Sequence, residues 1–168
     1  MPYRVFDDQN CSIARTLAIV GERWTLLVLR EISLGHRRFE EIRRSLGVAS
    51  NILSDRLATL VKHGILRRED EPPQYRLTDK GRDLQPVLIA LLQWGDRYTA
   101  GPPGPPIEHV HTACGHVARP RLHCSHCGEP IQRGELSARY GPVPTRGSAP
   151  TTSAASSGTR PDVARVAG

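Results

Sequence analysis

The apolar residues of the first hundred positions recur at helical spacing, and this pattern predicts four successive helices. A glycine follows each apolar stripe, at a place where it would end or kink the helix. The stripes and their glycines are 13–20 with Gly21, 24–32 with Gly35, 39–46 with Gly47, and 48–61 with Gly64.

The next segment alternates between apolar and polar residues, as short β-strands do. Two such runs, 65–69 and 74–77, are joined by Asp70-Glu71-Pro72-Pro73, which predicts a hairpin with a tight, proline-stiffened turn. Thr78 is then a good N-cap residue. The apolar positions that follow predict one long helix over 79–98, about 30 Å in length at 1.5 Å per residue.

Helices, a two-stranded hairpin and a further helix, in this order, describe a winged helix-turn-helix, a mostly α fold with a small β-wing. The helix at 48–61 is then the candidate recognition helix. Small polar groups and one arginine on its outer faces suit the major groove of DNA, where amide and guanidinium groups read base edges. A polar face that is merely solvated is the alternative, and the adjoining hairpin favours the DNA interpretation. The residues outside its apolar stripe are Ser50, Asn51, Ser54, Asp55 and Arg56.

The net charge adds only weak support for DNA binding. The 168 residues hold 23 basic and 17 acidic side chains, a net charge of +6, and 21 of the basic residues are arginine. Arginine suits two-pronged contacts with phosphate and guanine, but a codon preference for arginine would give the same surplus. No segment approaches the ~20 apolar residues of a membrane span, and the N-terminus has no signal-peptide core. We therefore expect a soluble cytoplasmic protein with no membrane partner.

Composition divides the chain into four parts. Residues 1–100 hold both tryptophans and most branched aliphatic residues, and 101–106 read GPPGPP, a stiff linker. Residues 107–140 concentrate three of the four cysteines and five of the seven histidines. Residues 141–168 are rich in Gly, Pro, Ala, Ser and Thr, and we expect this tail to be disordered.

The first part resembles the HxlR family of transcription regulators over residues 11 to about 96. The resemblance begins with Cys11–Leu17 and Ile19–Glu31, and ends with Leu84–Leu88 and Trp94-Gly95. It implies a dimeric, DNA-binding bacterial regulator whose first and last helices build the dimer interface. We predict a homodimeric repressor of a nearby operon, without enzymatic activity, that binds double-stranded DNA. Further matching positions are Gly35, Arg38-Phe39, the helix from Leu53 to Leu60, His63-Gly64, Tyr75–Thr78 and Gly81.

Phosphate contacts are expected from two groups of arginines. Arg37 and Arg38 open the third helix, whose N-terminus adds its own N–H donors. The wing is shorter than is common in the HxlR family, and three carboxylates at 69–71 lie near its tip, where they repel phosphate. The contacts of the wing must then come from the arginines of its strands, which are Arg67, Arg68 and Arg76.

Cys11 has two interpretations. Some HxlR members use an N-terminal cysteine here as an electrophile or oxidation sensor, so the resemblance implies a redox or small-molecule effector. Arg15, one helical turn away, would help to lower the pKa of such a thiol. The alternative is a cysteine that packs as a small apolar group at the start of a helix.

Residues 107–140 contain two half-motifs of metal-ligand type. His111-Thr112-Ala113-Cys114 and Cys124-Ser125-His126-Cys127 each place two soft ligands three positions apart, and each is followed by glycine. Together they resemble a small zinc ribbon in which one cysteine is replaced by histidine. We predict tetrahedral Zn²⁺ bound by His111, Cys114, Cys124 and Cys127. The alternative nitrogen ligands are His109, His116, His123 and His126, of which His116 is the nearest rival.

The predicted zinc is structural, because four protein ligands leave no position for water. So short a segment, with few apolar residues, would need the metal to fold. The absence of an H-x-E or HExxH pattern argues against a zinc hydrolase or deaminase. Other interpretations are a His-rich linker, a zinc-responsive or redox-responsive regulator, and a ribbon that docks a protein partner.

Overall fold

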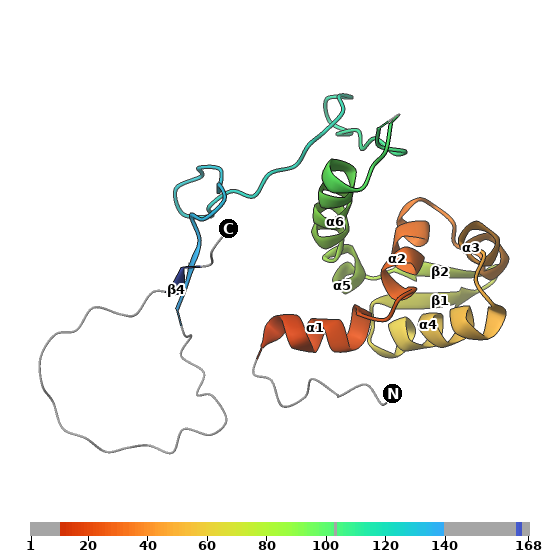
Figure 1. The fold of residues 1–168 in the computed structure, drawn as a ribbon. Helices are drawn as coiled ribbons and strands as arrows, with labels where there is room; N and C mark the ends of the chain where they lie inside the picture. The colour runs from red at the N-terminus through yellow and green to blue at the C-terminus, as the bar shows by residue number, and fades with distance from the viewer. Residues whose placement is uncertain (1–10, 103, 140–163, 166–168) are drawn as a thin grey trace, which may run out of the picture. The chain divides into compact units, whose positions relative to one another are not determined.

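The computed structural model describes residues 11–102, 104–139 and 164–165, and the chain divides into two units, 1–106 and 107–168 (Figure 1). The disorder predicted for 141–168 lies outside the described residues, apart from Ala164–Arg165. These two residues form strand β4, which pairs antiparallel with β3 (Ser137–Ala138) in the second unit.

The four predicted helices are confirmed. They are α1 (Ser12–Val20), α2 (Thr25–Ser33), α3 (Phe39–Leu46) and α4 (Ser50–Lys62). Gly47 ends α3 in the left-handed conformation, with φ of 61°, and its N–H donates to the carbonyl of Arg43. This conformation favours glycine, and it allows the chain to turn within three residues from α3 into α4.

The predicted hairpin is also confirmed, with a shorter turn. Strands β1 (Leu66–Asp70) and β2 (Pro73–Leu77) pair antiparallel, with Leu66 opposite Leu77 and Asp70 opposite Pro73. Only residues 71–72 therefore connect the strands. The N–H of Tyr75 donates to the carbonyl of Arg37 at 2.8 Å, which ties the wing to the segment that leads into α3.

The single long helix predicted over 79–98 is wrong. The structure has a short α5 (Asp79–Arg82) and a separate α6 (Gln85–Tyr98). Pro86 explains the break, because it has no N–H to donate four residues back and its ring would collide with that carbonyl. Pro86 is instead accommodated in the first turn of α6. The predicted cap is confirmed, since the Thr78 hydroxyl accepts a hydrogen bond from the N–H of Gly81 at 3.1 Å.

Gly81 is required at its position by a close approach. A Cβ there would lie 2.2 Å from the carbonyl oxygen of Ile65, so any larger residue would push α5 away from the base of the wing. The same carbonyl accepts the N–H of Thr78 at 3.1 Å.

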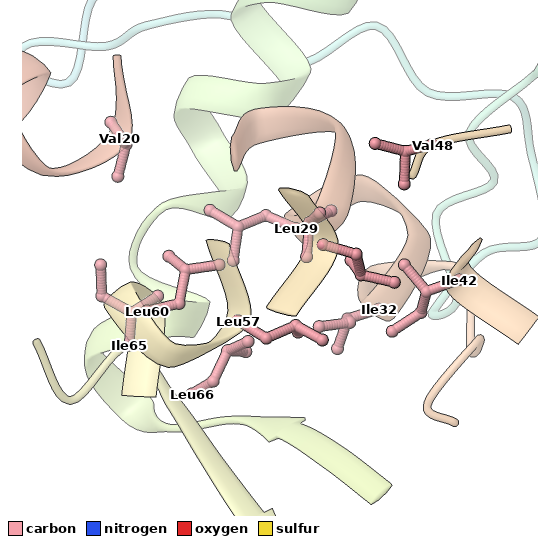
Figure 2. Close-up of a cluster of buried hydrophobic side chains, with 11 residues drawn as sticks. Val20, Leu29, Ile32, Ile42, Val48, Leu57, Leu60, Ile65 and Leu66 are labelled. Atoms are coloured by element: carbon pink, nitrogen blue, oxygen red, sulfur yellow. The ribbon is translucent and has the colours of Figure 1, made fainter. Parts of the chain in front are cut away.

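The core of the first unit lies between α2, α3, α4 and the start of β1. Figure 2 shows Leu29 and Ile32 of α2 facing Leu57 of α4, with Ile42 of α3 beside them. Each of these side chains is at most 5% exposed. The inner face of α4 is therefore fixed in the core, and its outer face is turned to solvent. None of the helices described for this chain is both long and apolar enough to span a membrane.

Candidate nucleic-acid interface and cysteine–histidine unit

Helix α4 presents a polar outer face at its N-terminal end. It buries Leu53, Leu57 and Leu60, while Ser50, Asn51, Ser54 and Asp55 are exposed. The N-cap is Ala49, whose backbone is extended and whose side chain cannot cap the helix. The exposure predicted for the small polar residues is confirmed, and they lie together on the first turns of the helix.

Arg56 lies elsewhere. Its side chain is only 23% exposed, and its Nη1 lies 3.4 Å from Oε2 of Glu22, which belongs to the connection between α1 and α2. Its Nε is buried without a hydrogen-bond partner among the described residues. The structure therefore separates Arg56 from the exposed face of α4, and its predicted contact with DNA bases stays a prediction.

Arg37 and Arg38 are exposed at the start of α3, as predicted. Their backbone N–H groups, however, donate to one carboxylate oxygen of Glu41, at 3.1 and 3.0 Å. These hydrogen bonds, that of Arg38 being the stronger, lower the pKa of Glu41. The helix N-terminus is thus already capped by a carboxylate, so phosphate binding here depends on the two guanidinium groups.

The arginines of the wing are already paired. Arg76 donates to Glu69 at 2.7 Å and Arg67 donates to it at 3.1 Å, because all three side chains share one face of the hairpin. These hydrogen bonds, led by that from Arg76, lower the pKa of Glu69. On the opposite face Arg68 pairs with Asp70 at 3.1 Å. The carboxylates of the wing therefore partly neutralise the arginines predicted to bind phosphate.

A cleft of about 490 Å³ lies between the wing and α4. Most of the side chains that line the cleft are apolar, and Arg68 is the one charged residue among them. Most of the lining residues belong to α4 and to the wing. The residues that line the cleft are Phe39, Ser54, Ala58, Val61, Arg68, Pro73 and Tyr75.

A buried carboxylate supports the loop that carries Arg37 and Arg38. Glu31 is 2% exposed, and it accepts hydrogen bonds from Arg30 at 3.0 Å and from His36 at 2.6 Å. Burial acts to raise the pKa of Glu31, but hydrogen bonds from Ser45, Arg30 and His36 outweigh it, and the pKa is lowered. Glu31 was not among the predicted site residues, although an acidic residue between the apolar positions of α2 is a visible signal in the sequence.

Helix α6 has an exposed apolar stripe. Val87, Leu91, Trp94 and Tyr98 are 44–61% exposed and follow one another at intervals of four, three and four residues, which places them on one face. Helix α1 adds Ile13 and Leu17, which are also exposed. An apolar face of this kind, on a domain with its own core, is typical of a surface that binds a partner.

A family model, HxlR-like helix-turn-helix, matches residues 19–102. A regulator of Mycobacterium tuberculosis, the uncharacterized HTH-type transcriptional regulator Rv3095, is 47% identical over 136 residues, covering 78% of this chain and 86% of the relative. This chain belongs to the HxlR-like helix-turn-helix family. The resemblance found in the sequence is thereby confirmed, and the chain is a transcriptional regulator with a DNA-binding helix-turn-helix.

Two solved structures resemble this HxlR-family chain. PA1607, described as a candidate transcription factor, has a TM-score of 0.70 and 34% identity, and the match covers 79% of this chain and 96% of PA1607. PA1374 of Pseudomonas aeruginosa, also a candidate transcription factor, has a TM-score of 0.56 and 36% identity, covering 81% of this chain and 96% of PA1374.

Cys11 is the N-cap residue of α1 in this HxlR-family chain. It is half-buried, its side chain makes no capping hydrogen bond, and its carbonyl accepts the N–H of Arg15 at 3.1 Å. This placement is compatible with both interpretations of Cys11, and its role as a sensor stays a prediction.

In the second unit the four predicted zinc ligands form two pairs. His111 Nδ1 lies 3.3 Å from the Cys114 sulfur, and the Cys124 sulfur accepts hydrogen bonds from the backbone of Cys127 and His126 and from the Cys127 thiol. These hydrogen bonds, led by that from the Cys127 backbone, lower the pKa of Cys124. Among the residues that the structure describes, no three His, Cys, Asp or Glu side chains are close enough to hold one ion.

Proposed function

We propose that this HxlR-family chain acts in the cytoplasm as a homodimeric repressor that binds a specific, roughly palindromic DNA site. The observation that carries the proposal is the division of α4 into two faces. Leu53 and Leu57 anchor its inner face in the core, while Ser50, Asn51 and Ser54 are exposed beside the wing. A rigid helix with small polar groups at its N-terminal end suits entry into a major groove.

The apolar stripe of α6 supports the homodimer. Its spacing of four and three residues is that of a helix seam covered by another helix, and a second copy of α6 offers the same stripe. Contact between identical faces generates a twofold axis. The two copies of α4 would then be related by this axis, which matches a palindromic site with one half-site for each subunit.

Selection of DNA from a random library by the purified full chain tests the proposal. We expect enrichment of an inverted repeat whose half-sites lie about 10 base pairs apart, or a multiple of that, because two recognition helices on one face of DNA are separated by whole turns. Light scattering of the complex should give two chains per site. A purified chain that binds all sequences equally, or that binds its site as a monomer, would contradict the proposal.

The repressor role needs a separate readout. A reporter gene placed behind the selected site should fall in expression when the chain is supplied and recover with Asn51→Ala. A rise in expression would contradict repression and leave the DNA-binding function intact, so the two parts of the proposal can fail independently.

A further inference from the structure

The second unit contains the same backbone structure twice. In residues 109–118 the N–H of His111 donates to the carbonyl of His116 (2.9 Å), and the N–H of Gly115 donates back to His111 (2.8 Å). In residues 122–131 the N–H of Cys124 donates to Glu129 (2.9 Å), and that of Gly128 donates back to Cys124 (2.9 Å). A shift of thirteen positions therefore superimposes the hydrogen bonds of one segment on those of the other.

The hydrogen bonds at the open ends of the two segments match as well. Ala118 donates to His109 at 2.7 Å, and Ile131 donates to Leu122 at 2.8 Å, at the same shift of thirteen positions. Both segments also close with an antiparallel bridge, Val110 with Val117 and His123 with Pro130. Each segment is thus a short hairpin with a tight turn at its tip. We call these segments the first knuckle (109–118) and the second knuckle (122–131).

The equivalence of the two knuckles indicates which histidine is the nitrogen ligand. His111 occupies the position of Cys124, and Cys114 occupies that of Cys127, so each knuckle offers two soft ligands from the same two places. His116, the nearest rival, corresponds to Glu129, which lies outside the ligand pair of the second knuckle. His123 lies in the second knuckle beside Cys124 and corresponds to Val110, which is not a ligand type.

The spacing within the first knuckle suits zinc. With Zn–N and Zn–S bonds of about 2.0 and 2.3 Å at a tetrahedral angle, a nitrogen and a sulfur ligand lie about 3.5 Å apart. The observed distance from His111 Nδ1 to the Cys114 sulfur is 3.3 Å. In the second knuckle the Cys124 sulfur accepts hydrogen bonds from the backbone of Cys127 and His126 and from the Cys127 thiol, so the two sulfurs lie side by side. Each knuckle therefore supplies half of a tetrahedral ligand set.

We propose that the two knuckles bind one structural Zn²⁺ ion through His111, Cys114, Cys124 and Cys127. The two pairs described in the structure are too far apart to share an ion, so binding must draw the knuckles together, and only residues 119–121 separate them along the chain. The ion replaces a hydrophobic core, because the apolar side chains Val110, Val117 and Leu122 are exposed. The site goes beyond DNA binding, since no ligand belongs to the first unit.

Metal analysis of the purified full chain tests the site. We expect about one zinc per chain in the wild type and loss of that zinc in His111→Ala and Cys127→Ala. His116→Ala and His126→Ala are the matched controls and should keep it. His111→Cys should also keep it, because four cysteines are also a common ligand set of structural zinc sites. A chain that is isolated without zinc, or equal zinc in the wild type and all variants, would overturn the site.

Cobalt substitution gives a second readout that does not depend on yield. Co²⁺ bound by three thiolates and one imidazole should show sulfur-to-metal charge-transfer absorption in the wild type and stronger charge transfer in His111→Cys. A spectrum without charge transfer would overturn the ligand set. If His116→Ala lost the metal while His111→Ala kept it, the assignment of His111 would be wrong.

Discussion

At the scale of single residues, Glu31 supports the loop that leads to Arg37 and Arg38 through its hydrogen bonds with Arg30 and His36. Glu31→Gln removes the charge that Arg30 and His36 face at hydrogen-bond distance, and it leaves those donors poorly paired next to the core. We expect the free energy of unfolding at pH 7 to fall by about 1–3 kcal/mol. Urea denaturation of both proteins measures the difference. Glu40→Gln is the matched control, since its pair with Arg43 is exposed, and should change stability little.

The pH dependence of the same pair has a defined sign. The folded-state pKa of Glu31 lies below the ordinary value of 4.5, so the carboxylate stabilises the fold above the unfolded-state pKa. That stabilisation disappears as the pH falls through the lowered value. The difference in stability between wild type and Glu31→Gln should therefore narrow below pH ~4.5. A difference that grows on acidification would contradict the assignment.

Asn51 and Arg37 should affect DNA binding in different ways. Asn51→Ala removes an amide that can read a base edge, so affinity for the selected site should fall by about 1–3 kcal/mol while binding to random DNA is unchanged. Arg37→Ala should weaken binding to every sequence and reduce the salt slope by about 1. Gel shifts at two salt concentrations distinguish the two effects. Arg82→Ala removes an equal charge from α5 and should leave both quantities unchanged.

The exposure of a residue could be predicted from the sequence where helical spacing alone decides it. Ser50, Asn51 and Ser54 follow from the apolar stripe of α4 and are exposed. The partial burial of Arg56 could not be predicted, because it depends on Glu22, a residue from a different part of the chain. The pairing of Arg76 with Glu69 likewise depends on the register of the hairpin, which the residue pattern does not give.

At the scale of elements, α6 provides the dimerisation prediction. Leu91→Glu places a charge in the centre of the exposed apolar stripe, where it would be buried against a second copy. We expect a folded monomer by light scattering, with unchanged helical circular dichroism and much weaker binding to a palindromic site. Gln85→Glu adds the same charge to the first turn of α6, away from the stripe, and should remain dimeric. A dimeric Leu91→Glu protein would show that another surface joins the subunits.

The elements themselves were largely predictable, and the exception has a local cause. Apolar periodicity and the glycines that follow it located α1 to α4, and alternation located the wing. The segment from α5 to α6 was predicted as one helix because its apolar spacing continues past Pro86. A missing N–H and a steric clash at that proline override the periodicity. The proximity of His111 to Cys114 and of Cys124 to Cys127 was predictable from their spacing, but the repeated hydrogen bonds that equate His111 with Cys124 appear only in the structure.

At the scale of the whole molecule, the two units differ in how they are held together. Among the described residues, the hydrophobic cluster and the partly buried side chains that pack against it all lie between Ile19 and Leu88. The second unit offers no comparable cluster among its described residues, and we propose that a metal ion takes its place. We therefore expect the first unit to unfold on heating and the second unit to unfold when zinc is removed.

Deletion of residues 107–168 tests this independence. Because the deleted part contributes nothing to the described core, the truncated chain should keep its melting temperature, its dimer and its base preference. It would, however, lose seven arginines and four carboxylates, about half of the net charge of +6. Binding to all DNA should therefore weaken somewhat at low salt and converge with the full chain at high salt. Altered sequence preference after the deletion would mean that the cysteine–histidine unit takes part in reading the DNA site.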